Sequence, residues 1–381
     1  MSEMLSEDER RIRDSVRRLA EERVRSRAME IDASGEYPQD MFELLKGFGL
    51  FALPFPPEFG GSGSLFLASL AIEELCRLCY NTAYLLILQW TPFAALFAGG
   101  SDEQKKRLLP GLAAGDLRAA IALTEPQSGS DLAGIRTRAR RVEGGYRLAG
   151  GKVWCTGASV ADFILVAARV EGAGINLFIV EKGAEGFAVG RAEKKMGARG
   201  VPSSALHLDD VFVGENERVG AEEGGFKIVM EGLNRTRPLI AARAVGLAQG
   251  AMELAIDFVK NRRAFGASVG DFQGVRWMIA DMGIEIEAAR SLLYRTARAV
   301  DEGLAGTALA PLAAMAKCLA SDVAMRVATQ ALQLFGASGI SSEMPINRYF
   351  RDAKVLQIVE GTNEIQRNII ARSLLGPPGR A

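Results

Sequence analysis

The stretch Val359-Glu360-Gly361-Thr362-Asn363-Glu364-Ile365-Gln366-Arg367, near the C-terminus, is the most informative part of this chain. A carboxylate directly before a glycine stands next to backbone that can approach a ligand closely. The Thr-Asn pair behind it supplies a helix N-cap, and the isoleucines that follow have helical spacing. A base in the loop just before a helix is well placed to abstract a proton. Glu360 is therefore the candidate catalytic residue, although a lone Glu-Gly pair is more often a solvated turn.

Five further motifs give that interpretation its weight. In the order of the chain they are Thr124-Glu125-Pro126-Gln127-Ser128-Gly129-Ser130-Asp131, Trp154-Cys155-Thr156, Arg262-Arg263-Ala264-Phe265-Gly266, Asp271-Phe272-Gln273 and Arg351-Asp352-Ala353-Lys354. With the stretch around Glu360, their order and spacing make the chain similar to the acyl-CoA dehydrogenase family. These flavoenzymes oxidise the α,β bond of acyl thioesters. The resemblance covers nearly the whole chain.

Composition excludes several other classes of protein. Forty-six basic and forty-six acidic residues cancel, so the charge favours neither nucleic acid nor an anionic membrane surface as a partner. Four cysteines and one histidine rule out a zinc or disulfide framework, and no metal site is expected. Cys76 and Cys79 form an isolated C-x-x-C in an apolar stretch, and we expect two core residues on one helix. Such cysteine usage fits a reducing compartment.

No segment predicts export or membrane insertion. Residues 1–13 are polar and of mixed charge, unlike a signal peptide. The longest apolar run, Ala83 to Ala98, is too short to span a bilayer and contains Gln89 and Pro92. It predicts a buried helix with a kink or break. We therefore expect a soluble, cytoplasmic protein with no membrane partner.

The texture of the sequence changes twice. Residues 1–117 are expected to form an N-terminal helical domain, and residues 118–222 a middle β domain of short apolar runs separated by Gly-rich and Asp-rich turns. Residues 223–381 are expected to form a C-terminal helical bundle with long periodic helices, the first of which Pro238 opens or kinks. The fold class is mostly α with an inserted β domain, which the resemblance implies to be barrel-like.

Dehydrogenation of an acyl thioester needs a base for the α-proton, donors for the enolate-like oxygen and a hydride acceptor. No side chain accepts hydride, so a cofactor is obligatory. Gly61-Ser62-Gly63 lacks a third glycine and a preceding strand, so it is not a dinucleotide fingerprint. The resemblance implies FAD, held between the β domain and the C-terminal bundle.

The resemblance also implies how Glu360 acts. It matches the catalytic base of the family, and burial would raise its pKa towards working pH. Its backbone N–H would bind the thioester oxygen together with a hydroxyl of FAD. Some relatives place the base near residues 233–237 instead, but that segment contains no carboxylate. The implied substrate-binding residues are Ser130, Asn234, Arg237 and Gly361.

Thirteen positions match residues that contact FAD in the family. Trp154 would pack beside the isoalloxazine ring, and Thr156 would bind near its nitrogen 5. Arg262 would cross a subunit interface to the pyrophosphate of a neighbour, which makes a homotetramer, or at least a dimer, the expected assembly. The full set is Leu123, Thr124, Gly129, Ser130, Trp154, Thr156, Arg262, Phe265, Gln273, Gln333, Gly336, Thr362 and Glu364.

Three alternatives stay open on the same resemblance. The first is an acyl-CoA dehydrogenase that passes electrons to an electron-transfer flavoprotein. The second is an acyl-CoA oxidase, or a dehydrogenase of an acyl-carrier-protein thioester. Asn234 bears on the choice of carrier, because it stands where an Asp often contacts the carrier. The third, a flavoprotein that protects nucleic acid, is disfavoured by the neutral charge. Leu86 and Trp90 either lie near the acyl tail of the substrate or pack in the core.

Overall fold

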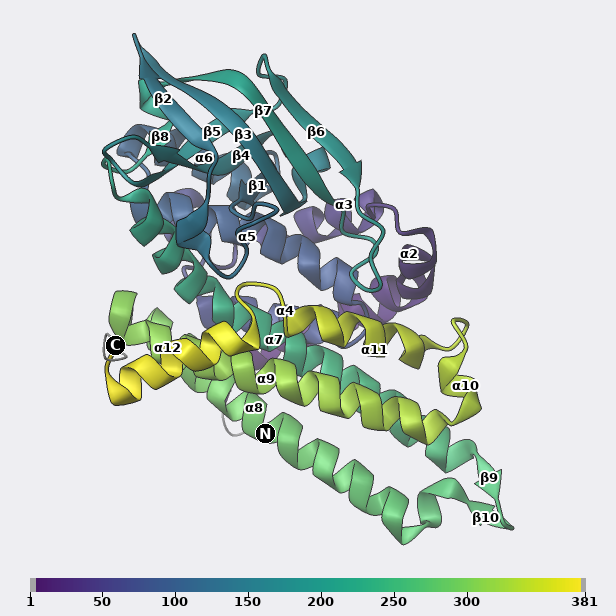
Figure 1. Ribbon diagram of the computed structural model, residues 1–381. Coiled ribbons are helices and arrows are strands. Elements are labelled where there is room, and N and C mark those ends of the chain that lie inside the picture. The colour runs from purple at the N-terminus through teal and green to yellow at the C-terminus, as the bar shows by residue number, and fades with distance from the viewer. Residues whose placement is uncertain (1–4, 378–381) are drawn as a thin grey trace.

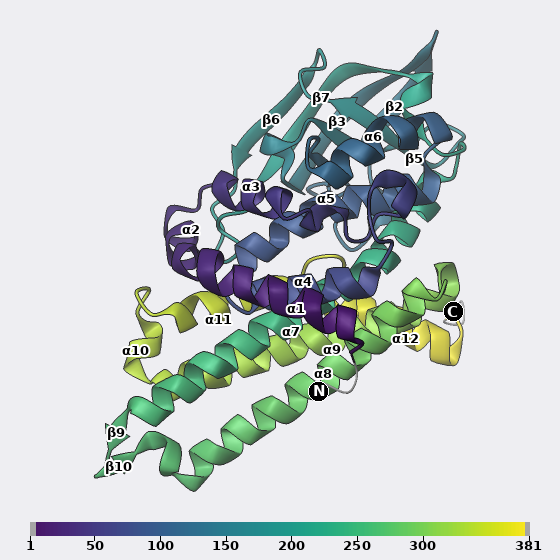
Figure 2. The same ribbon diagram turned by 180° about the vertical axis from the view of Figure 1, so that it is seen from behind.

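The computed structural model describes residues 5–377, and the predicted order of helices, β sheet and helical bundle is confirmed (Figure 1). The sheet lies at one end of the molecule and the long C-terminal helices at the other. The N-terminal helices pack against both parts, as the view from behind also shows (Figure 2).

The N-terminal helices begin at well-formed caps. At the start of α1, the Ser6 side chain accepts from Glu9 N at 3.2 Å and the Glu9 carboxylate accepts from Ser6 N at 2.7 Å, which satisfies two donors at the helix end. Ser101 caps α6 in the same way. The helices are α1 (Glu7–Leu19), α2 (Ala28–Ser34), α3 (Gln39–Gly47), α4 (Leu65–Cys76), α5 (Tyr80–Gly99) and α6 (Asp102–Ala114).

Helix α5 corrects two expectations. It is 20 residues long and continues through Pro92, so it is longer than its apolar run and is not broken there. Three described helices, α5, α7 (Gly225–Asn261) and α9 (Gly306–Phe335), are long and apolar enough to cross a membrane, but 78% of the apolar window of α5 is buried inside the protein. Burial, rather than length, argues against a span at α5. Cys76 ends α4 and Cys79 caps α5, so they are buried core residues but not on one helix.

The middle segment forms an eight-stranded sheet in the order β6-β7-β3-β2-β4-β5-β8, with β1 beside β4. Neighbours pair antiparallel except β1–β4 and β2–β4, which are parallel. Strands β6 and β8 are the ends of this path and do not pair with each other among the described residues. The strands are β1 (Ala119–Ala122), β2 (Arg138–Val142), β3 (Gly145–Thr156), β4 (Phe163–Val170), β5 (Ile175–Glu181), β6 (Phe187–Ala192), β7 (Ser203–Gly214) and β8 (Arg218–Val219).

The C-terminal part is built around α7, which contacts α4, α5, α8, α9 and α11. Pro238 lies inside α7 and does not open it. A short hairpin joins α7 to α8 at the far end of the bundle (Figure 1). The elements are α7 (Gly225–Asn261), β9 (Arg263–Ala264), β10 (Ala267–Ser268), α8 (Gln273–Asp301), α9 (Gly306–Phe335), α10 (Ala337–Ile340), α11 (Pro345–Leu356) and α12 (Asn363–Leu375).

Candidate active site

Glu360 lies in the turn between α11 and α12 and has an unusual backbone. Its φ is 56°, in the left-handed region that costs a residue with a Cβ roughly 1–2 kcal/mol. Among the described residues only six non-glycines have positive φ, and three of these, Trp154, Phe265 and Glu360, are predicted site residues. Backbone strain concentrates at functional sites, where the surrounding structure holds it in place.

Two threonines from different helices bind the Glu360 carboxylate. Thr236 on α7 donates to Oε2 at 3.1 Å, and the Thr91 hydroxyl on α5 lies 3.5 Å from Oε1 while its nearer acceptor is Ile87 O at 3.0 Å. The side chain lies deep in the protein but keeps some accessible surface. Burial raises the pKa of Glu360, while the Thr236 hydrogen bond and the charges of Arg237, Arg243 and Lys317 oppose the rise. The result is a carboxylate shifted towards the working range of a general base.

Arg237 lies beside this turn but does not form a bidentate pair with the carboxylate. Its Nε lies 3.5 Å from the Glu360 backbone oxygen, and its Nη1 donates to Asn234 Oδ1 at 2.5 Å. The predicted substrate residues Asn234 and Arg237 are therefore brought together with Glu360, and Gly361 follows directly. Ser130 is exposed on a loop of the β domain.

A buried polar network under the turn was not predicted from the sequence. Lys317 on α9 is fully buried, and its Nζ donates to Gly361 O at 2.9 Å and to Asn363 Oδ1 at 2.8 Å. Gln366 donates to the carbonyls of Glu360 and Gly361 at 3.2 and 2.9 Å. Burial lowers the pKa of Lys317 to about 8. The network fixes the strained turn that presents the carboxylate.

The β-domain residues form a second group, at the loop that follows β1 and at the end of β3. Trp154 is 57% exposed, and its neighbour Thr156 is half-buried with its hydroxyl 3.1 Å from Ser203 Oγ. Leu123 and Thr124 are half-buried. Gly129 is exposed, and a Cβ built there would meet nothing within 4 Å.

A buried ion pair, also missed from the sequence, anchors this loop to β3. Glu125, 3% exposed, accepts from Lys152 Nζ at 2.7 Å and from the backbone N–H groups of Arg136 and Thr137 at 2.6 and 2.9 Å. Burial alone would raise the pKa of Glu125, but these hydrogen bonds outweigh it and lower the pKa to about 2. Burial lowers the pKa of Lys152, and the neighbouring Glu125 carboxylate opposes that shift. The only sequence signal was a charged residue inside the Thr124–Asp131 motif.

A third group of predicted site residues lies beside the β9–β10 hairpin, at the end of the molecule opposite the β sheet. Phe265, at the hairpin's turn, is 97% exposed. The predicted residues here are Arg262, Phe265, Gln273, Gln333 and Gly336, all exposed. Figures 1 and 2 show the hairpin well apart from β3, which carries Trp154, and from the turn between α11 and α12, which carries Glu360.

The residues present fit the chemistry of a flavin dinucleotide. Trp154 offers an unpaired aromatic face, Thr124 and Thr156 offer hydroxyl groups, and Gly129 leaves backbone open to close approach. A shallow polar pocket beside the Glu360 turn is lined by Thr362 and Glu364, with Asn363, Asp322 and Arg367. These groups offer the kinds of contact that the resemblance implies for the flavin ring and the adenosine, and Arg262 would supply a cation for a pyrophosphate.

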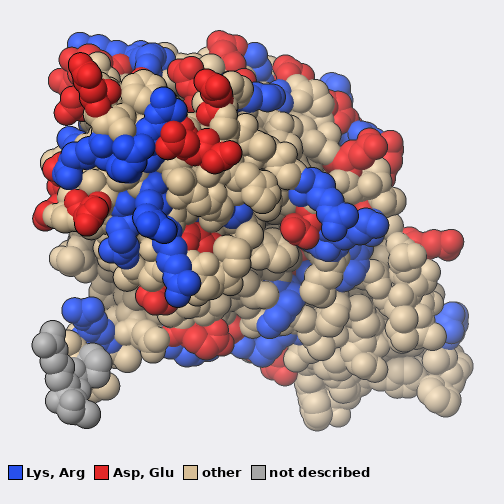
Figure 3. All heavy atoms as spheres, turned by 45° about the horizontal axis from the view of Figure 1, so that its top comes forward, with Lys and Arg blue, Asp and Glu red and all other residues tan. Residues whose placement is uncertain are grey.

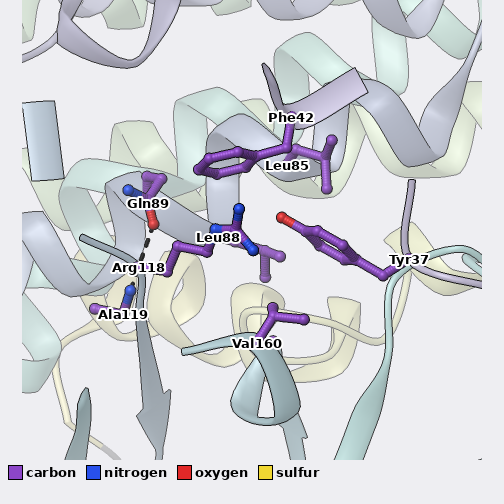
Figure 4. A pocket seen from close by; sticks show the side chains of 9 residues that line it. Tyr37, Phe42, Leu85, Leu88, Gln89, Arg118, Ala119 and Val160 are labelled. Carbon is purple, nitrogen blue, oxygen red and sulfur yellow. Dashed lines mark hydrogen bonds between the residues drawn. The ribbon is translucent and has the colours of Figure 1, made fainter. Parts of the chain in front are cut away.

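A separate small pocket lies between α3, α5 and the start of β1 (Figure 4). The Arg118 guanidinium lies 3.9 Å from the Phe42 ring centroid and 5.5 Å from that of Tyr37, and Gln89 Oε1 accepts from Ala119 N at 3.4 Å. Trp90, the next residue along α5, is 1% exposed and donates to Phe51 O at 2.8 Å. Trp90 is therefore a core residue whose ring nitrogen is already satisfied.

Comparison with known proteins places nearly the whole chain in one family. Three family models match in sequence order: the acyl-CoA dehydrogenase N-terminal domain over residues 6–116, the middle domain over 120–211 and the C-terminal domain over 223–375. A probable acyl-CoA dehydrogenase of Mycobacterium leprae is 39% identical over 97% of this chain and 96% of its own length. The cyclohexane-1-carbonyl-CoA dehydrogenase of Geobacter metallireducens is 40% identical over 97% and 98%.

Solved structures agree with the sequence relatives. The butyryl-CoA dehydrogenase of Megasphaera elsdenii has a TM-score of 0.93 at 35% identity, over 97% of this chain and 99% of that one. A chain from the structure of the electron transferring flavoprotein of Acidaminococcus fermentans has a TM-score of 0.93 at 36% identity, over 98% and 99%. A glutaryl-coenzyme A dehydrogenase in complex with glutaryl-CoA has a TM-score of 0.93 at 31% identity, over 98% and 96%.

Proposed function

The chain belongs to the acyl-CoA dehydrogenase family of FAD-dependent oxidoreductases that act on CH–CH bonds, and we propose that it converts an acyl-CoA thioester to the 2-enoyl-CoA. The observation that carries the proposal is Glu360: a buried carboxylate with a raised pKa, held by two threonines on a strained turn. A carbon acid as weak as a thioester α-carbon needs such a base.

In this reaction the Glu360 carboxylate takes the α-proton. FAD, when bound, supplies the acceptor for the β-hydrogen, which leaves as a hydride with its electron pair. The backbone N–H of Glu360 makes no hydrogen bond within residues 5–377, so it is free to donate to the thioester oxygen as negative charge develops there. Thr91 and Thr236 hold the Glu360 carboxylate in one orientation, so the carboxylate does not have to reorient before it accepts the proton.

We infer that Trp154, Thr156, Leu123, Thr124, Gly129 and Ser130 hold the flavin end of FAD, with Thr362 and Glu364 beside it. The hairpin group around Arg262 would complete the site of a neighbouring subunit, because it lies too far away to serve its own chain (Figure 1). Four exposed apolar side chains lie on or next to the hairpin and α8 and favour such an interface: Phe265, Phe272, Trp277 and Ile284.

The remaining parts of the proposal are a homotetramer, cytoplasmic location and an electron-transfer flavoprotein as acceptor. The similarity to a chain in the Acidaminococcus fermentans electron transferring flavoprotein structure supports that acceptor. Helix α7 buries 72% of its apolar window and α9 only 56%, which leaves part of α9 for contact with other chains rather than requiring a membrane.

The function is tested by titrating the purified flavoprotein anaerobically with acyl thioesters and recording the loss of flavin absorbance. The panel contains butyryl-CoA, octanoyl-CoA, cyclohexane-1-carbonyl-CoA and glutaryl-CoA, each also as the carrier-protein thioester. We expect bleaching by at least one CoA ester, and turnover with an electron-transfer flavoprotein. Dioxygen turnover would make the enzyme an oxidase. A flavin that dithionite reduces and no thioester bleaches would contradict the proposal.

A further inference from the structure

Lys317 on α9 carries a buried positive charge that no bound anion balances. Charged side chains usually lie on the surface with both signs interspersed, as over the upper part of the face in Figure 3. Lys317 is fully buried instead, and its ammonium group has three N–H donors for two described acceptors, Gly361 O and Asn363 Oδ1. Both acceptors are neutral, and among the described lysines only Lys46 and Lys152 form salt bridges. A buried charge without a bound counter-ion is costly, so packing alone does not account for this lysine.

The end of α12 makes the position still less favourable for a cation. Thr362 caps this helix and Asn363 is its first residue, so Lys317 donates to a side chain at the N-terminal end of α12. The N-terminus of a helix carries a partial positive charge, which repels an ammonium group. The fold therefore places the Lys317 charge where both burial and the helix oppose it.

The group that gains from this charge is the catalytic carboxylate. The acceptor Gly361 is the residue next to Glu360, and both have a left-handed backbone, with φ of 90° and 56°. The Lys317 charge opposes the rise in the pKa of Glu360, and the Glu360 charge opposes the fall in the pKa of Lys317. The other ionisable groups that act on one of these two residues lie on α7 and α9. They are Arg237, Arg243, Cys318 and Asp322.

Of the groups around Glu360, Lys317 is the one that changes its charge near neutral pH. Two of the others are arginines, whose guanidinium groups keep their proton in proteins. The Asp322 carboxylate accepts from Arg367 at 2.6 Å, and its pKa is lowered, so it stays ionised. Burial raises the pKa of Cys318, so its thiol stays neutral. Lys317, with a pKa of about 8, is charged below that pH and loses its charge above it.

We propose that Lys317 is a positioning residue for the catalytic base: its buried charge keeps Glu360 ionised at neutral pH, and its hydrogen bonds hold the turn that presents the carboxylate. This inference rests on the proposed function and names the residue that sets the pH range of the same site. A carboxylate that a cation stabilises is also a weaker base. Removing the charge should therefore slow proton abstraction at low pH, where Glu360 would be protonated, and preserve or speed it at high pH.

The test measures the rate of flavin reduction in the holoenzyme at about pH 6 and about pH 9, with a thioester that bleaches the flavin. The readout is the rate at the higher pH divided by the rate at the lower pH, because structural damage that is independent of pH cancels in this ratio. Lys317→Met removes both the charge and the hydrogen bonds, whereas Lys317→Gln keeps a neutral N–H donor. We expect both variants to raise the ratio by about tenfold, which corresponds to a rise of about one unit in the pKa of Glu360.

Two further variants are matched controls. Ser321→Ala removes a hydrogen bond of 3.0 Å to Asn363 Oδ1 from the same network and changes no charge. Lys106→Met removes the same formal charge as Lys317→Met, but from an exposed position on α6 where solvent and salt screen it. Neither control should change the ratio. A ratio raised as much by Ser321→Ala as by Lys317→Gln would overturn the role of the charge.

The parent enzyme decides if neither Lys317 variant retains FAD. As pH rises through about 8, loss of the Lys317 charge should make Glu360 a stronger base, so the rate should rise in a second step above the ionisation of Glu360 itself. A single step in that profile, or an unchanged ratio in folded Lys317 variants, overturns this inference and leaves the proposed function standing. No bleaching by any thioester at either pH overturns both.

Discussion

Glu360 has a strained backbone, and burial raises the pKa of its carboxylate. Glu360→Gln keeps the size of the side chain and the backbone donor but cannot accept the α-proton. We expect flavin reduction to slow by about 10²–10⁴-fold, with FAD content unchanged. In the parent enzyme the rate should fall as pH drops through the raised pKa of Glu360, since only the ionised form is a base. Stopped-flow spectroscopy measures both effects.

Glu343→Gln, at an exposed glutamate outside the site, is the control and should behave as the parent. A loss of less than tenfold in Glu360→Gln would mean that another group removes the proton. Loss of FAD together with activity would instead show that Glu360 holds the structure.

At the scale of single residues, the sequence predicted the candidate site residues that belong to motifs. It missed the residues whose partners are brought together only by folding. Glu360 and Trp154 belong to such motifs. Lys317 and Arg243 are lone basic residues on apolar helices, and that pattern usually marks a solvated side chain. Their neighbours come from distant segments: Lys317 binds residue 361, and Arg243 contacts Tyr80 and Tyr84. No local pattern reports such contacts.

The loop of residues 124–137 gives a prediction at the scale of elements, because one ion pair fastens it to β3. Glu125→Gln leaves Lys152 buried without its counter-ion, and we expect a loss of about 3 kcal/mol in the free energy of unfolding. The folded pKa of Glu125, about 2, lies below its ordinary 4.5, so this stability is complete above pH 4.5 and is lost as pH falls towards 2. Urea unfolding at several pH values measures it.

Glu222→Gln is the control for that experiment. Glu222 pairs with Arg141 on the surface, where ion pairs contribute at most about 1 kcal/mol. If Glu125→Gln were no more damaging than Glu222→Gln, the buried pair would not anchor the loop.

The places of the strands were predictable where the pattern was simple. The apolar runs at residues 146–148, 163–166, 177–180 and 205–208 all lie in strands. Helix α9 was harder. The spacing of Leu312, Met315, Leu319 and Val323 predicts its buried face, but only Val323 is fully buried, whereas Ala313, Lys317 and Ala320 on another face are. Small residues allow helices to pack most closely, so the face that carries alanines is the buried one. A prediction from hydrophobicity alone ranks alanine below leucine and therefore chooses the leucine face.

For the whole molecule, the order of its three parts followed from the sequence texture, but the distance between the hairpin and the β domain did not. We expect Arg262→Ala to weaken both FAD retention and subunit association, measured by flavin absorbance and sedimentation. Arg263→Ala is the control, since Arg263 is exposed in the same hairpin and donates to Gly266 O at 3.1 Å. A stable monomer of Arg262→Ala that keeps its flavin would show that each chain holds its cofactor alone.

The separation of the hairpin group from Trp154 has a consequence for handling the enzyme. If a neighbouring subunit completes each flavin site, the fraction of chains that retain FAD depends on the concentration of the protein as well as on that of FAD. Dilution would then separate the subunits and release FAD without any chemical damage. The yellow colour of the protein would fade as the protein concentration falls below the range in which the subunits associate. Adding inactive but foldable chains would restore colour better than adding free FAD alone.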